Sequence, residues 1–352
     1  MHERTVQLYE RQAALYAEKK PARHWAQADA FAPRCLPGLP VLDAGCGPGG
    51  YLRSLPRPAV ALDAAVAMLE LTRAAAPDAL LVQADLEALP FRDRAFGGAW
   101  ARNTYLHVAR TRFPLAMARL HWALAPGAPL ELSVATGDEE GVWDGGDMPG
   151  RFFVHWQPDV LRELVLGAGF EDVEVTEVED DTWARGRRAR TLPDTVGPGM
   201  RLLVCGLNPS LVAADAGFGF AGPTNRFWPV VVEAGLVTRP RDPLHALLID
   251  GVGMTDLVKR ATPRAGLLSG GEYRSGAERV RRLVAWLRPG AVLFVGLEGW
   301  RAAVDRRAVA GAQPHGFGGV PAYLMPSTSG LNARTLRAEL VAHVRAACAL
   351  AG

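Results

Sequence analysis

Two polar loops, about 120 residues apart in the second half of the chain, each follow a short apolar run. Residues 202–205 lead into Gly-Leu-Asn-Pro-Ser at 206–210, and residues 321–324 lead into Met-Pro-Ser-Thr-Ser-Gly-Leu at 325–331. Apolar runs of this length indicate short buried strands, and the Pro, Ser, Gly and Asn after them are typical of turns. If the strands belong to one parallel sheet, both turns lie at its carboxyl edge, where open α/β sheets bind ligands.

Three more segments follow the first loop: Gly-Phe-Gly-Phe at 217–220, Pro-Thr-Asn-Arg-Phe-Trp at 223–228 and Gly-Met-Thr-Asp-Leu-Val at 253–258. An Asn-Pro pair after a strand is ordinary turn chemistry, but five segments in a fixed order are specific. Together they resemble the mismatch-specific uracil and thymine DNA glycosylases, a branch of the uracil-DNA glycosylase superfamily. The resemblance covers about residues 200–350 and implies a three-layer α/β/α domain with a parallel sheet.

The resemblance also implies roles for single residues. Asn208 would place the attacking water, and the backbone at Leu207 and Phe220 would hold the departing base. The Phe220 ring would stack on that base, while Gly330 and Leu331 would enter the duplex. A carboxamide positions water without taking its proton as a carboxylate does, so slow hydrolysis of good leaving groups such as uracil is expected. Two simpler alternatives stay open, namely Phe220 as a core aromatic and Leu331 as a core contact.

The sequence departs from that family in its two loops. Ser210 stands where the family has glycine, and the second loop lacks the histidine of the efficient uracil-specific enzymes. The chain has three lysines, Lys19, Lys20 and Lys259, and neither loop contains one. Schiff-base chemistry is therefore not expected. The sequence predicts a monofunctional glycosylase without cofactor or metal, acting on double-stranded DNA that contains a mismatched or damaged pyrimidine.

A second motif lies in the first half of the chain, where residues 41–49 read Val-Leu-Asp-Ala-Gly-Cys-Gly-Pro-Gly. Its candidate binding residues are Asp43, Gly45, Gly47 and Gly49. Two further apolar runs end in Asp63 and Asp85. This pattern resembles the class I S-adenosylmethionine-dependent methyltransferases and implies a Rossmann-like sheet. The resemblance implies that the glycines contact the cofactor, that Asp63 binds its ribose hydroxyls and that Asp85 contacts its adenine.

A glycine-rich loop alone does not separate methyltransferases from dehydrogenases, but three strands that each end in aspartate favour the methyltransferase. A working enzyme and a degenerate cofactor-binding scaffold both stay open. The resemblance is nearest to the methyltransferases that act on small molecules, which implies a small-molecule acceptor of unknown identity. The motifs of DNA methyltransferases are absent. Asn103 and His107 follow the fourth expected strand, and His107 is either a base or a structural histidine.

The charge distribution supports two domains of different kinds. Residues 1–184 contain 17 Lys and Arg against 26 Asp and Glu, whereas residues 185–352 contain 22 against 11. A basic half beside an acidic half is typical of a nucleic-acid-binding domain joined to a small-molecule enzyme. The arginine-rich and Pro/Gly-rich stretch at 185–199 predicts an exposed linker. The expected domains are thus 1–184 and 200–352.

Other classes of protein are disfavoured. The four cysteines are scattered without a CxxC pair, so neither a zinc site nor an iron-sulfur cluster is expected. No apolar run approaches the ~20 residues of a membrane span, and residues 1–20 form a charged amphipathic segment unlike a signal peptide. A cytoplasmic protein without a membrane partner is expected. The alternative to a bifunctional enzyme is a small-molecule methyltransferase whose second domain is a noncatalytic nucleic-acid-binding module.

Overall fold

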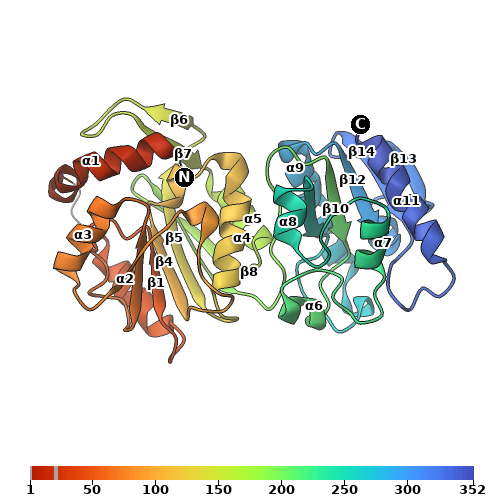
Figure 1. The fold of residues 1–352 in the computed structure, drawn as a ribbon, viewed down its shortest axis with the longest axis horizontal. Helices are drawn as coiled ribbons and strands as arrows, with labels where there is room; N and C mark the ends of the chain where they lie inside the picture. The colour runs from red at the N-terminus through yellow and green to blue at the C-terminus, as the bar shows by residue number, and fades with distance from the viewer. Residues whose placement is uncertain (1, 20–22) are drawn as a thin grey trace. The chain divides into compact units, whose positions relative to one another are not determined.

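The computed structural model describes residues 2–19 and 23–352 and divides the chain into two compact units, residues 1–189 and 190–352. Each unit is built on its own sheet with helices packed against it, and parallel strands dominate both sheets (Figure 1). The expected α/β class with two sheets is therefore confirmed. No helix in the described part of the chain is long and apolar enough to cross a membrane.

The described part of the first unit contains a nine-stranded sheet. Its strands are β1 (Val41–Ala44), β2 (Ala59–Asp63), β3 (Leu80–Gln83), β4 (Gly98–Arg102), β5 (Pro129–Thr136), β6 (Glu140–Trp143), β7 (Arg151–Trp156), β8 (Phe170–Val178) and β9 (Asp181–Arg188). The parallel strands follow the order β3-β2-β1-β4-β5, and β9 pairs antiparallel with both β5 and β8. β1 is buried along its whole length, as expected for a parallel strand covered on both faces.

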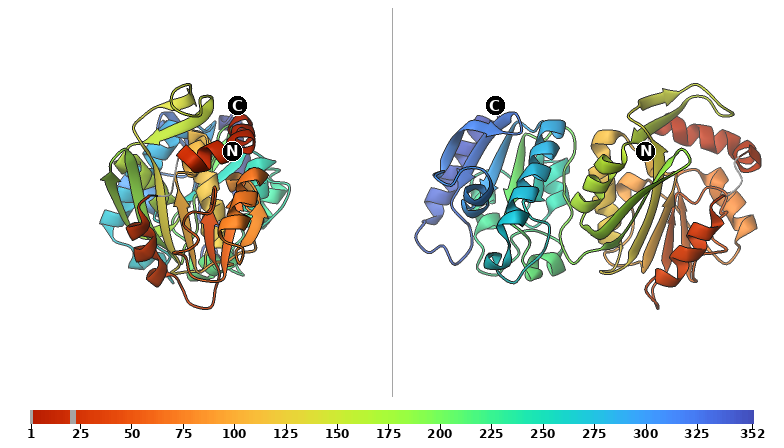
Figure 2. Two further views of the ribbon diagram at one scale, coloured as in Figure 1. Left: turned by 90° about the vertical axis from the view of Figure 1, so that its left-hand side faces the viewer. Right: turned by 180° about the vertical axis from the view of Figure 1, so that it is seen from behind.

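Helices cover this sheet and its carboxyl edge. They are α1 (Glu3–Lys19), α2 (Trp25–Phe31), α3 (Val66–Ala75), α4 (Phe113–Ala123) and α5 (Pro158–Gly167), with short 3-10 turns η1 (Ala32–Arg34), η2 (Leu86–Ala88), η3 (Tyr105–His107) and η4 (Arg110–Arg112). Helix α1 packs against α3 and β7 (Figure 2). The amide of Phe152 donates to Thr5 Oγ1 at 2.8 Å. This contact brings the start of the chain to the β6–β7 hairpin.

The structure differs from the exposed linker expected at residues 185–199. Residues 185–188 end strand β9, where Arg185 lies 3.5 Å from the buried carboxylate of Glu131 and Arg188 is 3 % exposed. After the boundary, Thr195 pairs with Met254 of the second sheet. The arginines therefore neutralise a buried acid and extend a strand. Composition alone could not separate such a strand from a linker, because the partners of these residues are distant in sequence.

The described part of the second unit contains a five-stranded sheet in the order β11-β10-β12-β14-β13. Its strands are β10 (Leu202–Gly206), β11 (Val252–Asp256), β12 (Ala291–Val295), β13 (Gly311–Phe317) and β14 (Val320–Met325), of which β13 is the antiparallel edge. The predicted loops follow β10 and β14, which are both parallel to the intervening β12. Both loops therefore lie at the carboxyl edge of one sheet, as the sequence predicts.

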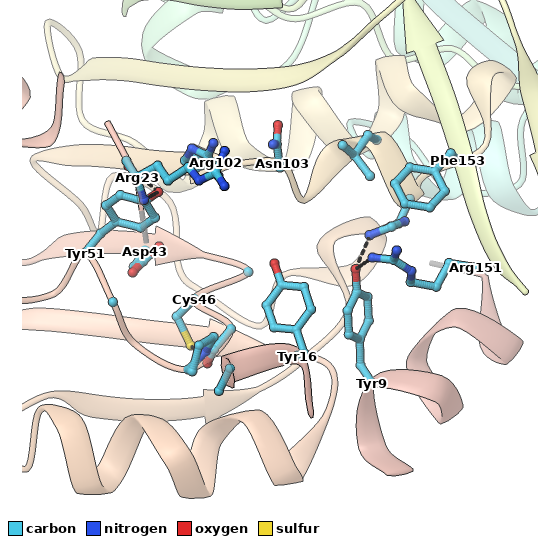
Figure 3. Close-up of a pocket in the computed structure, with 17 residues that line it drawn as sticks. Tyr9, Tyr16, Arg23, Asp43, Cys46, Tyr51, Arg102, Asn103, Arg151 and Phe153 are labelled. Carbon is cyan, nitrogen blue, oxygen red and sulfur yellow. Dashed lines mark hydrogen bonds between the residues drawn. The ribbon is translucent and has the colours of Figure 1, made fainter. Parts of the chain in front are cut away.

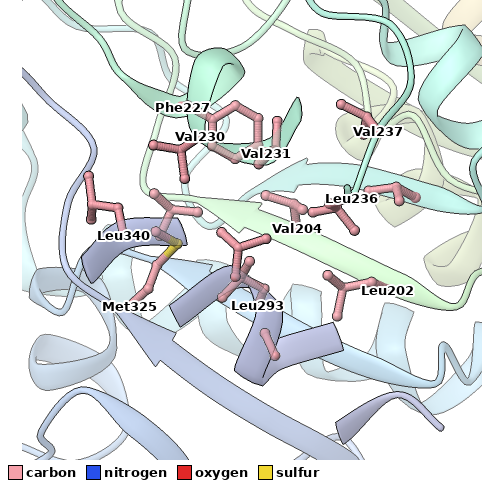
Figure 4. Packing of buried hydrophobic residues seen from close by; sticks show 14 of the residues in the cluster. Leu202, Val204, Phe227, Val230, Val231, Leu236, Val237, Leu293, Met325 and Leu340 are labelled. Carbon is pink, nitrogen blue, oxygen red and sulfur yellow. The ribbon is translucent and has the colours of Figure 1, made fainter. Parts of the chain in front are cut away.

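The helices of the second unit complete its core. They are α6 (Leu211–Ala216), α7 (Phe227–Glu233), α8 (Pro243–Leu248), α9 (Gly270–Leu287), α10 (Glu298–Ala303) and α11 (Arg337–Leu350), with the 3-10 turn η5 (Ala265–Leu267). Leu202, Val204 and Leu293 of the sheet pack under Phe227 of α7 and Leu340 of α11 (Figure 4). This core fixes the strand ends from which the loops emerge.

Candidate functional site

The loop after β1 has a backbone that only glycine accommodates at two positions. Gly45 has φ +79°, and a Cβ there would lie 1.9 Å from Thr104 Oγ1. Gly49 has φ +81°, and a Cβ there would lie 3.1 Å from the Cα of Thr72. Glycine adopts such a conformation at little cost and lets other groups approach the backbone closely. The two glycines thus let the loop pack closely against Thr104 and Thr72.

A cavity of about 420 Å³ opens beside this loop (Figure 3). Asp43, Gly45 and Gly47 line it, whereas Gly49, Asp63 and Asp85 are not among its described lining residues. Six residues were expected at a cofactor site, and the structure brings half of them to this cavity.

The carboxylates at the ends of β2 and β3 hold turns in this structure. Asp63 accepts hydrogen bonds from the amides of Gly47 and Ala65, both at 2.9 Å. Asp85 accepts one from the amide of Glu87 at 2.9 Å. A carboxylate oxygen can accept more than one hydrogen bond, so these contacts leave Asp63 capacity for a ligand.

Asp43 is the most unusual polar group of the cavity. Its side chain is 1 % exposed, and its Oδ2 has no hydrogen-bond partner among the residues that the structure describes. Burial and the nearby charge of Asp63 raise the pKa of Asp43 to about 8. A buried carboxyl group without a partner is costly unless a ligand satisfies it. The position favours a cationic ligand group.

His107 lines the cavity with both ring nitrogens engaged. Nδ1 lies 2.6 Å from the carbonyl oxygen of Phe152, which can only accept, so Nδ1 carries the proton. Nε2 then accepts from the Tyr9 hydroxyl at 2.8 Å. Burial lowers the pKa of His107 to about 4, which keeps the ring neutral. These contacts favour the structural alternative for His107 over a catalytic base.

Asn103 also lines the cavity, at the end of β4. Its Nδ2 donates to Asp181 at 3.1 and 3.2 Å, and its Oδ1 accepts from Ser133 Oγ at 2.9 Å. The same Asp181 lies 3.3 Å from Arg102. The network fixes both side chains at the rim of the cavity.

In the second unit, Asn208 has a fixed amide orientation. Its Nδ2 lies 3.1 Å from the Pro209 carbonyl, 3.0 Å from the Arg260 carbonyl and 2.8 Å from Thr262 Oγ1. Two carbonyl acceptors can only face the NH₂ group, so the assignment of oxygen and nitrogen follows from the contacts. Oδ1 points away from them and has no hydrogen-bond partner among the described residues. The side chain therefore presents an acceptor at the carboxyl edge of the sheet.

Ser210 has a structural reason for its departure from the family's glycine. It is the N-cap of α6, and its Oγ accepts from the amide of Ala213 at 3.1 Å. Serine is among the best N-cap residues because its oxygen satisfies an otherwise free helix amide.

Phe220 is partly buried and has φ +58°, an uncommon conformation for a side chain of this size. Its ring stacks on that of Phe227, with centroids 3.9 Å apart. A Cβ at Gly206 would lie 3.4 Å from Phe220 Cζ, so the ring lies beside the end of β10. One face of the ring thus packs on the core at the edge that carries Asn208.

The second loop presents a fully accessible side chain. Leu331 is 96 % exposed, so the alternative that it is a core contact is wrong. Arg226 holds the loop by donating to the carbonyls of Asn332 at 2.6 Å and Thr335 at 2.7 Å. Gly330 permits close packing, because a Cβ there would lie 2.4 Å from Thr224 Oγ1.

Several groups at these sites have no counterpart in the sequence predictions. Asp256 ends β11 beside Gly206, and its burial raises its pKa to about 6. Its place at the end of a strand could have identified it. Asp194, Tyr9 and Arg151 have no such signal, because their partners are far away in sequence. No cluster of metal-binding side chains occurs within residues 2–19 and 23–352.

Each of the two units contains a match to a known family model. Residues 41–127 match the family model of a methyltransferase domain, and residues 193–349 match that of the uracil DNA glycosylase superfamily. Similar solved structures include a S-adenosylmethionine-dependent methyltransferase from Mesorhizobium loti, at 20 % identity over 47 % of this chain and 98 % of that one, with TM-score 0.39. Another is the 1,6-didemethyltoxoflavin-N1-methyltransferase of Burkholderia thailandensis, at 19 % identity over 52 % and 88 %, with TM-score 0.41. The chain therefore joins a methyltransferase domain to a domain of the uracil DNA glycosylase superfamily.

Proposed function

We propose that residues 190–352 hydrolyse the N-glycosidic bond of uracil opposite guanine in double-stranded DNA, with thymine and alkylated pyrimidines as further candidate bases. The observation that carries this proposal is the orientation of Asn208. Three acceptors hold its NH₂ group, which leaves Oδ1 to accept a hydrogen bond from a water. Such a water is placed for attack but keeps its proton until late in the reaction, so the reaction depends on a good leaving group.

The other residues of the site fit the same reaction. Base excision leaves an anionic base, and backbone amides at Leu207 and Phe220 are the groups proposed to stabilise it. The Phe220 ring would stack on the extruded base with its outer face, since Phe227 covers the inner one. Leu331 and Gly330 would enter the duplex. With no lysine in either loop, the product is an abasic site left uncleaved by the protein.

The test is an excision assay on duplexes that each contain one lesion, in the presence of a metal chelator. The full chain should release uracil from the G·U duplex and leave an alkali-labile site. Asn208→Ala should lose about a hundredfold or more of the single-turnover rate while binding DNA as before, because water placement belongs to the chemical step. Release by the wild type at the background rate on every lesion would favour the alternative of a noncatalytic DNA-binding module.

A second function rests on a separate observation, the unpartnered Oδ2 of Asp43 in the cavity of the first unit. We propose that this cavity binds S-adenosylmethionine. Asp43 would pair with the cationic amino-acid end, and Gly45, Gly47 and Gly49 would bring the loop against it. Asp63 would accept from the ribose hydroxyls and Asp85 would contact the adenine. When bound, the cofactor supplies an electrophilic methyl group, and the residues around it need only orient the acceptor.

Calorimetry in two buffers of different ionisation enthalpy tests this assignment. Because the pKa of Asp43 is about 8 before binding, pairing with a cation should release a proton near pH 7. Asp43→Asn should bind S-adenosylmethionine at least about tenfold more weakly and release no proton from this site. Asp78→Asn, at an exposed position, is the matched control. Equal affinity and equal proton release in wild type and Asp43→Asn would remove Asp43 from the site.

A further inference from the structure

Arg151 is a buried cation without an acidic partner. It is 8 % exposed and lines the cavity of the first unit. Its Nε donates to the Met148 carbonyl at 3.0 Å, and its Nη1 donates to the Tyr9 hydroxyl at 3.3 Å. No carboxylate of the described residues lies within the 4.0 Å of an ion pair. Buried guanidinium groups are normally paired, because an uncompensated charge is costly to take out of water.

Arg151 lies at the end of the cavity away from Asp43. Figure 3 shows Asp43, Tyr51 and Arg102 on one side and Arg151 with Tyr9 on the other. The glycine loop and Asp43 form the proposed cofactor end. The end with Arg151 is therefore left for the methyl acceptor.

Aromatic rings form the walls around this guanidinium. Its Cζ lies 5.0 Å from the centroid of the Phe153 ring and 5.8 Å from that of Tyr9. His107 beside them is neutral and hydrogen-bonded at both nitrogens. This end of the cavity thus combines one free positive charge with flat apolar surfaces.

No acid of the described residues forms an ion pair with this charge. Arg102, also in the lining, already pairs with Asp181 at 3.3 Å. Asp43, at the other end, is largely protonated near neutral pH, since burial raises its pKa to about 8. An anionic ligand would supply the missing partner of Arg151.

We propose that the methyl acceptor is a small aromatic carboxylate whose carboxylate pairs with Arg151 and whose ring packs against Phe153 and Tyr9. The inference rests on the proposed methyltransferase function. It assigns Arg151 to recognition of the acceptor and not to the carboxylate of the cofactor. A planar guanidinium suits this role, because it can bind a carboxylate through two parallel hydrogen bonds.

The experiment is calorimetry of the full chain with 4-hydroxybenzoate and its neutral counterpart 4-hydroxybenzamide, with and without saturating S-adenosylhomocysteine. Wild type should bind the acid at least about tenfold more tightly than the amide. Arg151→Gln should lose that preference, and Arg151→Lys should restore part of it. Both variants should bind S-adenosylhomocysteine within about twofold of wild type. Arg112→Gln, on an exposed arginine outside the cavity, is the control for loss of one positive charge.

The outcomes separate the two proposals. Equal binding of acid and amide by wild type, or binding of neither, overturns the acceptor class. Loss of S-adenosylhomocysteine binding in a folded Arg151→Gln assigns the arginine to the cofactor and also overturns it. If wild type does not bind S-adenosylhomocysteine, the proposed methyltransferase function is wrong. The comparison of acid and amide without cofactor tests only the acceptor class. Melting curves of each variant report whether loss of the Met148 contact has unfolded the hairpin.

Discussion

The ring of Phe220 lies flat on the ring of Phe227, with centroids 3.9 Å apart and planes inclined by 19°. Phe227 is fully buried in the core of the second unit, whereas Phe220 is only partly buried. A side chain at the carboxyl edge of the sheet is therefore held in place by one that is part of the packing. The uncommon φ of +58° at Phe220 fits a position that its surroundings impose.

This relationship predicts that Phe227→Leu slows base excision although Phe227 lies beneath the proposed stacking ring. The substitution removes an aromatic pair that contributes about 0.5–1.5 kcal/mol and leaves Phe220 free to move. Single-turnover excision of uracil should fall about tenfold, with a loss of unfolding free energy of about 1–2 kcal/mol in urea. Phe218→Leu is the matched control, since Phe218 packs on Trp228 and not on Phe220. Equal slowing in both variants would contradict the support role.

Thr262→Val tests how the orientation of Asn208 is maintained. Thr262 is 2 % exposed, and its Oγ1 accepts from Asn208 Nδ2 at 2.8 Å. Valine has a similar shape but no acceptor, so one of the three contacts that set the amide is lost. We expect uracil excision to slow about tenfold while DNA affinity, measured by fluorescence anisotropy, stays the same. Thr238→Val, which removes a hydroxyl elsewhere in the unit, should leave the rate unchanged.

Asp194 is predicted to anchor the start of the second unit. Its carboxylate is 4 % exposed and pairs with Lys259 at 2.9 Å and with Arg279. Burial alone would raise the pKa of Asp194, but Arg279 and Lys259 bring it below its ordinary value. Asp194→Asn should cost about 3 kcal/mol of unfolding free energy, because two partly buried cations lose their partner. In wild type this stabilisation is complete above about pH 4 and is lost as the pH falls further. Asp215→Asn, at an exposed salt bridge, should cost less than about 1 kcal/mol.

His107 gives a prediction with a defined pH window. Its pKa is about 4 in the folded protein, below the ~6.5 of an exposed histidine, so the unfolded chain binds more protons between these values. The contribution of the neutral His107 to the free energy of unfolding is therefore complete above about pH 6.5 and is lost as the pH falls towards 4. Asp43 acts in the opposite direction over the same range, since its folded pKa is raised. The measurement is thus the difference between wild type and His107→Gln in urea unfolding. Between pH 7 and pH 4.5, the free energy of unfolding of wild type should fall by roughly 2–3 kcal/mol more than that of His107→Gln. Parallel pH curves would contradict a buried neutral histidine.

The parts of the fold that follow from local pattern could be predicted from the sequence. Short apolar runs before Asp43, Asp63 and Asn208 became parallel strands, because a strand covered on both faces must be apolar throughout. Contacts between distant segments could not be predicted. Arg151 meets Tyr9 across 142 positions, so no local pattern identifies either residue as a wall of the cavity. For the same reason, the sequence predicted a linker at residues 185–188, where the structure has the arginine-rich end of strand β9.

The exposure of Leu331 predicts how the second unit opens a duplex. Extruding a base leaves a gap in the stack, and an apolar side chain that fills it offsets part of the few kcal/mol lost in unstacking. Leu331 is 96 % exposed on a loop held by Arg226, so its insertion into a gap would remove no contact from the core. Leu331→Ala should therefore slow excision from a paired G·U duplex at least about tenfold more than excision from single-stranded DNA, where flipping is nearly free.

A matched variant separates this role from a general effect of losing a surface leucine. Leu336 lies outside the loop and is 65 % exposed, so Leu336→Ala removes the same atoms from a similar environment. It should leave the ratio of duplex to single-strand rates unchanged. Both variants should melt within about 2 °C of wild type, because neither side chain is part of the core.

If Leu331→Ala slows excision equally on both substrates, the leucine acts in the chemical step or in DNA binding and does not fill the gap in the stack. If it lowers the melting temperature strongly, the loop depends on Leu331 for its own packing. If Leu331 fills the gap left by the extruded base, Leu331→Ala must slow excision selectively on paired DNA while the melting temperature stays unchanged.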